Sequence, residues 1–349
     1  MSSKKAISVL ATSVLATVVL AGCGVGNSTS NNAGSSNSGQ SSSSTASAKS
    51  TGDGKSYTMA LVPGLTTDPF YITMNNGAQA EAKKLGVKLL FQGATAMTAS
   101  DQLPVVNSLI SQGVNALLVA PADANALTPP LKTAAQQGIK VVTVDTSVSD
   151  TSFLTAAVTS NNYQGGEAAA DALAKASNGK GEVAVINFDK GVTTADARRA
   201  GFMAEIKKYP GMKVVADEYC NNSETTADSD VSSILLAHPN LVGVFGTNLY
   251  AAVGSGQAVK SSGKAGQVNV IAYDAEPEEI QDIKDGLIYG TVAQNPYQEG
   301  QLAVEYAYDS LTGKNTFPKS TQLENLVITK QNVNNSSTQN WIYATGSNN

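Results

Sequence analysis

Polar and aromatic side chains follow the ends of several short apolar runs in this sequence, where they could bind a small molecule. In open sheets of parallel strands, ligands bind outside the carboxyl ends of the strands, so residues at these positions can share one site. The residues at these ends are Asp68, Phe70, Tyr71, Ala120–Asp123, Asp145, Thr146, Phe188, Arg198, Arg199, Cys220–Asn222, Thr247, Asn248, Asp274 and Gln294–Pro296. Carboxylates and amides bind several hydroxyls, arginine offers a planar fork, and aromatic faces cover C–H surface. This set is typical of a site for a polyhydroxyl ligand.

Each of these residues also has a purely structural interpretation. Three of them stand where helices would begin and could be N-cap residues: Asp68, Asp123 and Asn248. For Asp123 we favour the cap. Arg198 and Arg199 are adjacent, so both cannot point into one pocket, and Phe188 could belong to a core. The prediction of a binding site therefore depends on the coincidence of many such strand ends.

The sequence gives little support for catalysis. His238 is the only histidine, and it stands just before an apolar run, where a surface or helix-end role fits better than acid–base work. No GxSxG, HExxH or cysteine–histidine pair is present. Paired carboxylates can hydrolyse glycosides, but nothing in the sequence indicates that Asp145 and Asp274 flank a scissile bond. We therefore expect a binding protein and not an enzyme, with no metal or cofactor.

Short apolar runs alternate with segments of helical length from Tyr57 onward. The runs are 59–62, 87–91, 116–120, 141–145, 182–188, 213–219, 241–245, 269–274 and 289–293. This alternation predicts βαβ units and parallel sheets. Nine strands are many for one sheet, and the pattern breaks at SNNYQGG (160–166). We therefore predict an α/β protein with two doubly wound lobes of similar build.

The first 55 residues have a different character. Residues 1–22 have the form of a secretory signal, with Lys4, Lys5, an apolar stretch and then LAGC (20–23). LAGC resembles the lipobox of bacterial lipoproteins, which implies a lipid on Cys23 and an extracytoplasmic, membrane-anchored protein. The apolar stretch is too short for a membrane span. Residues 23–55 are rich in Ser, Gly and Asn and predict a disordered tether.

Charge and cysteine content exclude several classes of protein. Without residues 1–22, 21 basic side chains stand against 28 acidic ones, a net charge of −7. An acidic body does not favour nucleic-acid binding. Apart from Cys23 the chain has one cysteine, Cys220, which excludes a disulfide within the body and a zinc–cysteine cluster.

A series of short motifs resembles the ribose-binding-protein branch of the type I periplasmic binding proteins. In order along the chain they are DPFY (68–71), GAQAEAKKLG (77–86), LLVAPAD (117–123), VVTVDT (141–146), SNNYQGG (160–166), RRAGF (198–202), VFGTN (244–248), IAYDAEPE (271–278) and QNPYQEG (294–300). Single motifs are weak, but their number and order over about 57–332 are specific. The resemblance implies two Rossmann-like lobes joined by a three-strand hinge.

The resemblance also implies the lobe boundaries. The N-terminal lobe is predicted to comprise 56–160 and 296–322, and the C-terminal lobe 161–295 and 323–336, with 337–349 as a tail. The three crossings fall near Ser160–Asn162, Asn295 and 320–325, and the last of them places the run ENLVIT (324–329) in the C-terminal lobe.

The resemblance assigns ligand contacts to particular positions. By motif they are Asp68, Phe70, Tyr71, Asp145, Thr146, Arg198, Asn222, Asn248, Asp274 and Asn295. The Arg-x-x-Gly-Phe pattern selects Arg198 over Arg199. The chain departs from ribose binders at several positions: Asp68 and Ala120 stand where those proteins have Asn, and Thr146 stands where they have Arg. Ribose binders also have an aromatic residue near the position of Asn222. Ribose is therefore not implied, and another pentose, a hexose, a polyol or a modified sugar stays open.

The implied function is capture of a sugar for an ABC permease and its ATPase, by a monomer that binds no nucleic acid. A lipoprotein that senses a ligand for a membrane receptor or kinase is the alternative. A sugar-responsive repressor would need a helix-turn-helix before residue 57, where the chain has LAGC and the Ser-rich segment instead. An extracytoplasmic hydrolase is the remaining alternative.

Overall fold

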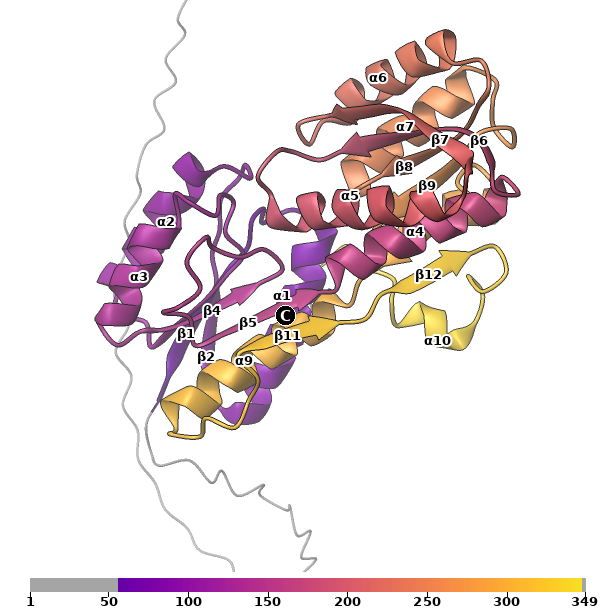
Figure 1. The fold of residues 1–349 in the computed structure, drawn as a ribbon. Helices are drawn as coiled ribbons and strands as arrows, with labels where there is room; N and C mark the ends of the chain where they lie inside the picture. The colour runs from indigo at the N-terminus through magenta and orange to yellow at the C-terminus, as the bar shows by residue number, and fades with distance from the viewer. Residues whose placement is uncertain (1–55, 347–349) are drawn as a thin grey trace, which may run out of the picture. The chain divides into compact units, whose positions relative to one another are not determined.

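The structure is a computed structural model that describes residues 56–346. The predicted signal (1–22), lipidated Cys23 and tether (23–55) lie outside these residues. The described chain forms two six-stranded sheets (Figure 1). Between residues 56 and 346, no helix is both long and apolar enough to cross a membrane.

The first sheet is parallel throughout, with strand order β11-β5-β4-β3-β1-β2. Its strands are β1 (Thr58–Val62), β2 (Lys88–Phe91), β3 (Ala116–Val119), β4 (Lys140–Val144), β5 (Ala156–Ser160) and β11 (Ser320–Leu323). The central strands are apolar at successive positions because helices cover both faces of the sheet. Those helices are α1 (Pro69–Leu85), α2 (Ala99–Ser111), α3 (Thr128–Gln136) and α9 (Pro296–Leu311).

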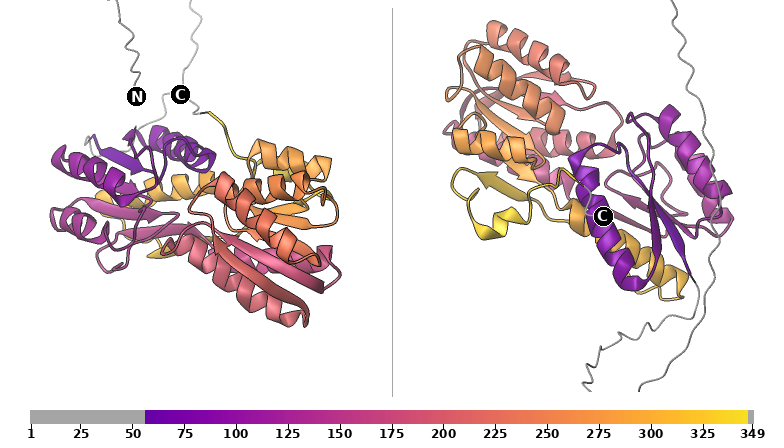
Figure 2. Two further views of the ribbon diagram at one scale, coloured as in Figure 1. Left: turned by 90° about the horizontal axis from the view of Figure 1, so that it is seen from above. Right: turned by 180° about the vertical axis from the view of Figure 1, so that it is seen from behind.

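Alternate residues of β1 show how the two faces are used. Met59 and Leu61 pack in one apolar cluster with Met74 of α1, while Val62 packs in another with Leu109 of α2. On the first of these faces α1 and α9 lie side by side, as Figure 2 shows, although more than 200 residues separate them in sequence. The sheet therefore holds the start of α1 at the carboxyl ends of its strands.

The second sheet repeats the order of the first, β12-β10-β9-β8-β6-β7. Its strands are β6 (Lys180–Asn187), β7 (Gly211–Tyr219), β8 (Leu241–Gly246), β9 (Asn269–Tyr273), β10 (Gly290–Ala293) and β12 (Leu326–Thr329). Only β12 runs antiparallel to its neighbour, β10. The helices of this second lobe are α4 (Asn162–Ala176), α5 (Thr193–Glu205), the 3₁₀ turn η1 (Ile206–Lys208), α6 (Glu224–Ala237), α7 (Leu249–Ser261), α8 (Pro277–Asp285) and α10 (Ser336–Gln339).

Three passages of chain join the two sheets. They run from β5 to α4, from β10 to α9, and from β11 to β12. The prediction of an α/β protein with two similar lobes and three connections is confirmed, and each of the nine predicted runs overlaps a strand. Strands β5 and β11 were not predicted as separate elements. Their burial alternates or stays low, because β11 is an edge strand and β5 lies next to it, so neither has a continuous apolar run.

Helices α4 and α5 cross at two glycines, and this crossing places Arg198. A Cβ on Gly166 would lie 1.9 Å from the carbonyl oxygen of Arg198, and one on Gly201 would lie 2.0 Å from that of Tyr163. No other residue allows such a close approach of two helix backbones. The SNNYQGG segment (160–166) thus begins the second lobe, and its Gly166 also allows the close approach of helix α5, which carries Arg198.

Candidate binding site

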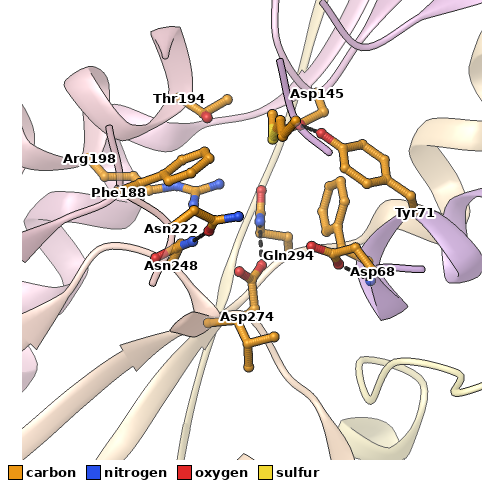
Figure 3. A pocket seen from close by; sticks show the side chains of 13 residues that line it. Asp68, Tyr71, Asp145, Phe188, Thr194, Arg198, Asn222, Asn248, Asp274 and Gln294 are labelled. Atoms are coloured by element: carbon orange, nitrogen blue, oxygen red, sulfur yellow. Dashed lines mark hydrogen bonds between the residues drawn. The ribbon is translucent and has the colours of Figure 1, made fainter. Parts of the chain in front are cut away.

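A pocket lies where the carboxyl ends of the two sheets face each other. Its lining residues are Asp68, Phe70, Tyr71, Met97, Asp145, Phe188, Thr194, Arg198, Asn222, Asn248, Leu249, Asp274 and Gln294. Figure 3 shows Asp68, Tyr71 and Asp145 on one side and Arg198, Phe188, Asn222 and Asn248 on the other, with Gln294 and Asp274 between them. Both lobes therefore supply walls of the same pocket.

The first wall is built at the start of α1. Asp68 has extended backbone and its Oδ1 accepts a hydrogen bond from the Phe70 backbone N–H at 2.8 Å, so it is the N-cap of the helix, with Pro69 as the first helical residue. Phe70 and Tyr71 follow with their rings edge to face at 5.1 Å between centroids. Both rings are almost fully buried, and both line the pocket. Asp68 thus caps the helix with one oxygen and belongs to the pocket as well.

Asp145 and Asp274 occupy equivalent positions in the two lobes. Each follows the fourth strand from the edge strand β2 or β7, which is β4 or β9. Each donates its backbone N–H to the next strand, to the carbonyl oxygen of Val158 or Val292, at 3.0 Å. The carbonyl oxygen of each accepts a hydrogen bond from a threonine hydroxyl of that same strand, Thr159 or Thr291. The repeated topology therefore aims two carboxylates at one pocket from opposite sides.

Three pocket residues have left-handed backbone. The φ angles are 58° at Asp145, 57° at Asn222 and 93° at Asp274. Non-glycine residues in this region cost of order 1–3 kcal/mol and cluster at ligand sites, where the surroundings hold them in place. Aspartate and asparagine tolerate the conformation best. Two other non-glycine residues with positive φ, Asn178 and Asn221, do not line the pocket, whereas at these three positions the left-handed backbone carries a pocket side chain.

Arg198 is the buried cation of the site. Its Nε donates to Asn162 Oδ1 at 2.8 Å, one terminal nitrogen donates to the Thr247 carbonyl at 2.9 Å, and its guanidinium lies 3.8 Å from the centre of the Tyr273 ring. Within the described chain no carboxylate lies within ion-pair distance of it. Arg199 points elsewhere and pairs with Asp217. The arginine selected by sequence is therefore the one that reaches the pocket.

The amide side chains are also held by specific contacts. Asn248 caps α7 through its Oδ1, which accepts from the Ala251 N–H, while its Nδ2 donates to Asn222 Oδ1 at 2.8 Å. Gln294 Nε2 donates to Asp274 Oδ1 at 2.6 Å. Like Asp68, Asn248 combines the role of a cap with a place in the pocket wall.

Burial and mutual repulsion change the protonation of the carboxyl groups. Burial, with the charges of Asp274 and Asp145, raises the pKa of Asp68 to about 7. Burial also raises the pKa of Asp145 to about 6, although the Tyr71 hydroxyl, which donates to it at 2.6 Å, and Arg198 both act in the opposite direction. Three carboxyl groups thus share the pocket with one arginine, and their burial and closeness favour the protonated forms of Asp68 and Asp145.

Two residues predicted to contact ligand do not line this pocket. The Thr146 hydroxyl donates to the Pro121 carbonyl at 2.8 Å, and Asn295 is the N-cap of α9, accepting from the Gln298 N–H at 3.1 Å. Each of them directly follows a pocket residue in the sequence, Asp145 or Gln294. Neighbouring side chains in a turn point in different directions, so only one of each pair faces the pocket. The assignment of ligand contacts to these two residues stays a prediction.

Five lining residues were missing from the predicted set: Met97, Phe188, Thr194, Leu249 and Gln294. Phe188 and Gln294 are among the strand-end residues of the sequence analysis, but the family motifs did not select them as contacts; Gln294 directly follows β10. Met97 could not be found this way because it lies on the loop between β2 and α2 and packs against Phe188, Val192 and Ala195 of the other lobe. The prediction that Asp123 caps a helix is wrong: its carboxylate accepts hydrogen bonds from the backbone N–H groups of Asn125 and Ala126 in a turn, and the N-cap of α3 is Leu127.

Comparison with known proteins places the chain in a family. Residues 59–315 match the model of the periplasmic binding protein domain. The chain belongs to the periplasmic binding protein family. This binding protein is 33% identical over 267 residues to the ribose import binding protein of Bacillus subtilis, covering 76% of its own chain and 85% of the relative. Its fold is the two-lobe, type I form of the family.

Solved structures of ABC-transporter solute-binding proteins are similar over nearly their whole length. One from Agrobacterium vitis, with α-D-tagatopyranose bound, has a TM-score of 0.80 and 38% identity, covering 82% of this binding protein and 99% of that chain. One from Actinobacillus succinogenes, with D-allose bound, has a TM-score of 0.76 and 28% identity, covering 80% and 99%. The pocket residues, which run from Asp68 to Gln294, lie within residues 59–315 matched by the family model.

Proposed function

We propose that this protein captures a monosaccharide or a related polyol between its two lobes and delivers it to an ABC import permease driven by an ATPase. The observation that carries the proposal is the composition of the pocket. Three carboxylates, Asp68, Asp145 and Asp274, face a small space together with one buried arginine, and none of them is within ion-pair distance of it. Ligand hydroxyls would complete these hydrogen bonds.

Each part of the pocket matches a part of a sugar. Carboxylates accept from hydroxyls, Arg198 and the asparagine amides donate to hydroxyl and ring oxygens, and aromatic rings cover the C–H faces of the ring. Phe70 and Tyr71 offer rings from the first lobe and Phe188 offers one from the second. Binding is favoured over turnover because the relatives matched by this chain are binding proteins.

The proposed mechanism is hinge closure about the three connecting passages. We assign residues 56–160 and 296–322 to one lobe and residues 161–295 and 323–336 to the other. Across the pocket mouth Met97 packs against Phe188, and the Ser147 N–H lies 3.3 Å from Thr193 Oγ1. A sugar that contacts both walls stabilises this arrangement over a more open one by its differential affinity.

Three departures from ribose binders guide the choice of ligand. Asp68 has a carboxylate, which only accepts hydrogen bonds when ionised, where ribose binders have an amide. Ala120 has no polar group where they have an amide, and Thr146 has no charge where they have an arginine. We therefore place ribose behind other pentoses, hexoses and polyols. Tagatose and allose, which are bound in two similar structures, are the first sugars to test.

The proposed location is the outer face of the cell membrane, with a lipid on Cys23 as the only anchor and with the binding protein acting as a monomer. LAGC (20–23) supports the anchor, and the import relatives support an extracytoplasmic site of action. Cell fractionation tests it: the full-length chain should sediment with membranes, and a Cys23→Ala variant should lose that association.

A thermal-shift screen tests the ligand class. Tagatose, allose, ribose, other pentoses and hexoses, and polyols would each be added to the purified protein, since a ligand that binds only the folded state raises the melting temperature. At a concentration about 100 times the Kd, the stabilisation is about 2.7 kcal/mol, which shifts the melting temperature by several degrees. A shift with at least one sugar or polyol supports the proposal. No shift with the whole panel would reject it.

A further inference from the structure

The segment after β12 returns to the pocket. It packs closely on the body, because Val333 and Tyr343 are almost fully buried and Thr338 is too. The sequence predicted a tail over 337–349, yet the described part of that stretch contains a tyrosine with 3% of its surface exposed. In Figure 2 the yellow C-terminal segment runs from the second lobe toward the first.

Tyr343 bonds to the second lobe at the residues that carry a pocket carboxylate. Its backbone N–H donates to the Ala275 carbonyl at 2.9 Å, and its hydroxyl donates to Asp274 Oδ1 at 3.0 Å. The same hydroxyl accepts from the Gln294 backbone N–H at 3.3 Å. The Tyr343 hydroxyl thus donates one hydrogen bond and accepts another, and the residues it bonds to, Asp274 and Gln294, both line the pocket.

The same segment bonds to the first lobe. The Tyr343 ring meets Phe70 edge to face, with centroids 5.8 Å apart. The Ala344 N–H donates to Thr73 Oγ1 at 2.7 Å, and Asn76 Nδ2 donates to the Gly346 carbonyl at 3.1 Å. These contacts all fall on α1, whose first turn forms the aromatic wall, so a single short segment touches both walls of the site.

The two strand-end aspartates have matching partners. Asp145 Oδ2 accepts from the hydroxyl of Tyr71, and Asp274 Oδ1 accepts from the hydroxyl of Tyr343. Burial, followed by the nearby negative charge, raises the pKa of both phenols well above the usual value, so both hydroxyls stay protonated and can only donate to these carboxylates. Gln294 and Tyr343 both donate to Asp274 Oδ1, and within the described residues no hydrogen bond is made to Asp274 Oδ2, so that oxygen can accept from a ligand.

We propose that Tyr343 is a positioning residue of the sugar site, which fixes the Asp274 carboxylate in its ligand-binding orientation and links it to the aromatic wall of the first lobe. The proposal rests on the proposed function. Gln294 and Tyr343 hold the same carboxylate oxygen from two directions, so rotation of the carboxylate would break both hydrogen bonds. The C-terminal segment is therefore part of the binding machinery.

The test compares Tyr343→Phe with Tyr306→Phe. Both changes remove one buried hydroxyl and keep the ring. Tyr306 is a matched control because it lies in the first lobe and shares its hydrogen bond with Thr321, away from the pocket. Calorimetry with the sugar found in the screen should give about five- to twentyfold weaker binding for Tyr343→Phe, from the loss of a hydrogen bond to a charged group. Tyr306→Phe should bind within about twofold of wild type.

Monodeoxy analogues of that sugar separate positioning from general destabilisation. The analogue that lacks the hydroxyl accepted by Asp274 should bind wild type and Tyr343→Phe about equally, because the two losses are coupled. Equal affinity of wild type and Tyr343→Phe for the full sugar would overturn the proposal. A loss of affinity in Tyr343→Phe that is the same for the full sugar and for every monodeoxy analogue would also overturn the proposal.

A second measurement needs no ligand. In free protein, amide hydrogen exchange at 273–276 and in the first turn of α1 should become faster in Tyr343→Phe and stay unchanged in Tyr306→Phe. Unchanged exchange at both places would overturn the positioning role. If the wild-type protein bound no sugar or polyol, the proposed function would fail while this measurement still decided whether Tyr343 holds the Asp274 loop.

Discussion

Replacing Asp68 with asparagine should weaken the pH dependence of stability in the ligand-free protein. Burial and the charges of Asp274 and Asp145 raise the pKa of Asp68 to about 7, from a usual value near 3.8. Between these two values the folded protein keeps a proton that the unfolded chain has lost, so the free energy of unfolding falls as pH rises. The loss is complete once pH passes about 7. Asparagine is as good an N-cap as aspartate, so the helix start is preserved.

The magnitude follows from the width of the pH window. From pH 5.5 to pH 7 the wild-type protein should lose about 1.36 kcal/mol per pH unit through Asp68, or about 2 kcal/mol in all. Water that enters the cleft screens the charges, so we expect about half of this, about 1 kcal/mol. For a protein of this size that is a difference of about 2–4 °C in melting temperature.

Calorimetric melts at pH 5.5 and pH 8 measure this effect. The fall in melting temperature between the two should be about 2–4 °C smaller in Asp68→Asn than in wild type. Asp123→Asn is the matched control, since Asp123 also accepts backbone N–H groups at a strand end but is exposed and outside the pocket. Equal pH dependence in wild type and Asp68→Asn would refute the argument that burial, together with the charges of Asp274 and Asp145, raises this pKa.

Three further changes test the site and its support. Asp145→Ala should weaken sugar binding about 30- to 100-fold in calorimetry, at about 1–3 kcal/mol for each strong hydrogen bond lost, and undiminished binding would show that the pocket is assigned wrongly. Arg198→Lys should cost about tenfold in affinity, because an ammonium cannot keep the planar contact with Tyr273 and the bonds made by the guanidinium, whereas equal affinity would argue for a simple point charge. Gly166→Ala should lower the free energy of unfolding by about 1–3 kcal/mol in denaturant melts, since its Cβ would overlap the Arg198 carbonyl, while Gly256→Ala, whose Cβ would make ordinary contact at 3.8 Å, should not destabilise.

The order of elements could be predicted from the sequence because local rules govern it. Continuous apolar runs predicted nine strands, and Asp68-Pro69 predicted the start of α1. The same rules missed β11, an edge strand that is partly exposed, and β5 beside it, in which buried and half-buried residues alternate, so neither has a continuous apolar run. They also allowed a structural and a functional role for Asp68 and Asn248, and both residues turned out to combine a helix cap with a place in the pocket wall.

The choice between adjacent residues needed more than local rules. Resemblance by motif selected Arg198 over Arg199, and the structure places Arg198 in the pocket because α4 and α5 cross at Gly166. Motif position selected Asn295, yet Gln294 faces the pocket while Asn295 caps α9. A motif identifies a turn, whereas the direction of each side chain depends on how the turn is packed.

By itself, the sequence determined the alternation of strands and helices, the two-lobe α/β architecture and the chemical character of the strand ends, because each of these depends on residues close together in the chain. The tertiary structure decided which of those ends meet. Asp145 and Asp274 are 129 positions apart in the sequence and face one pocket only because two sheets of equal strand order oppose their carboxyl ends. Tyr343 reaches Asp274 and Phe70 for the same reason: contacts between distant segments depend on packing in three dimensions, which no local pattern records.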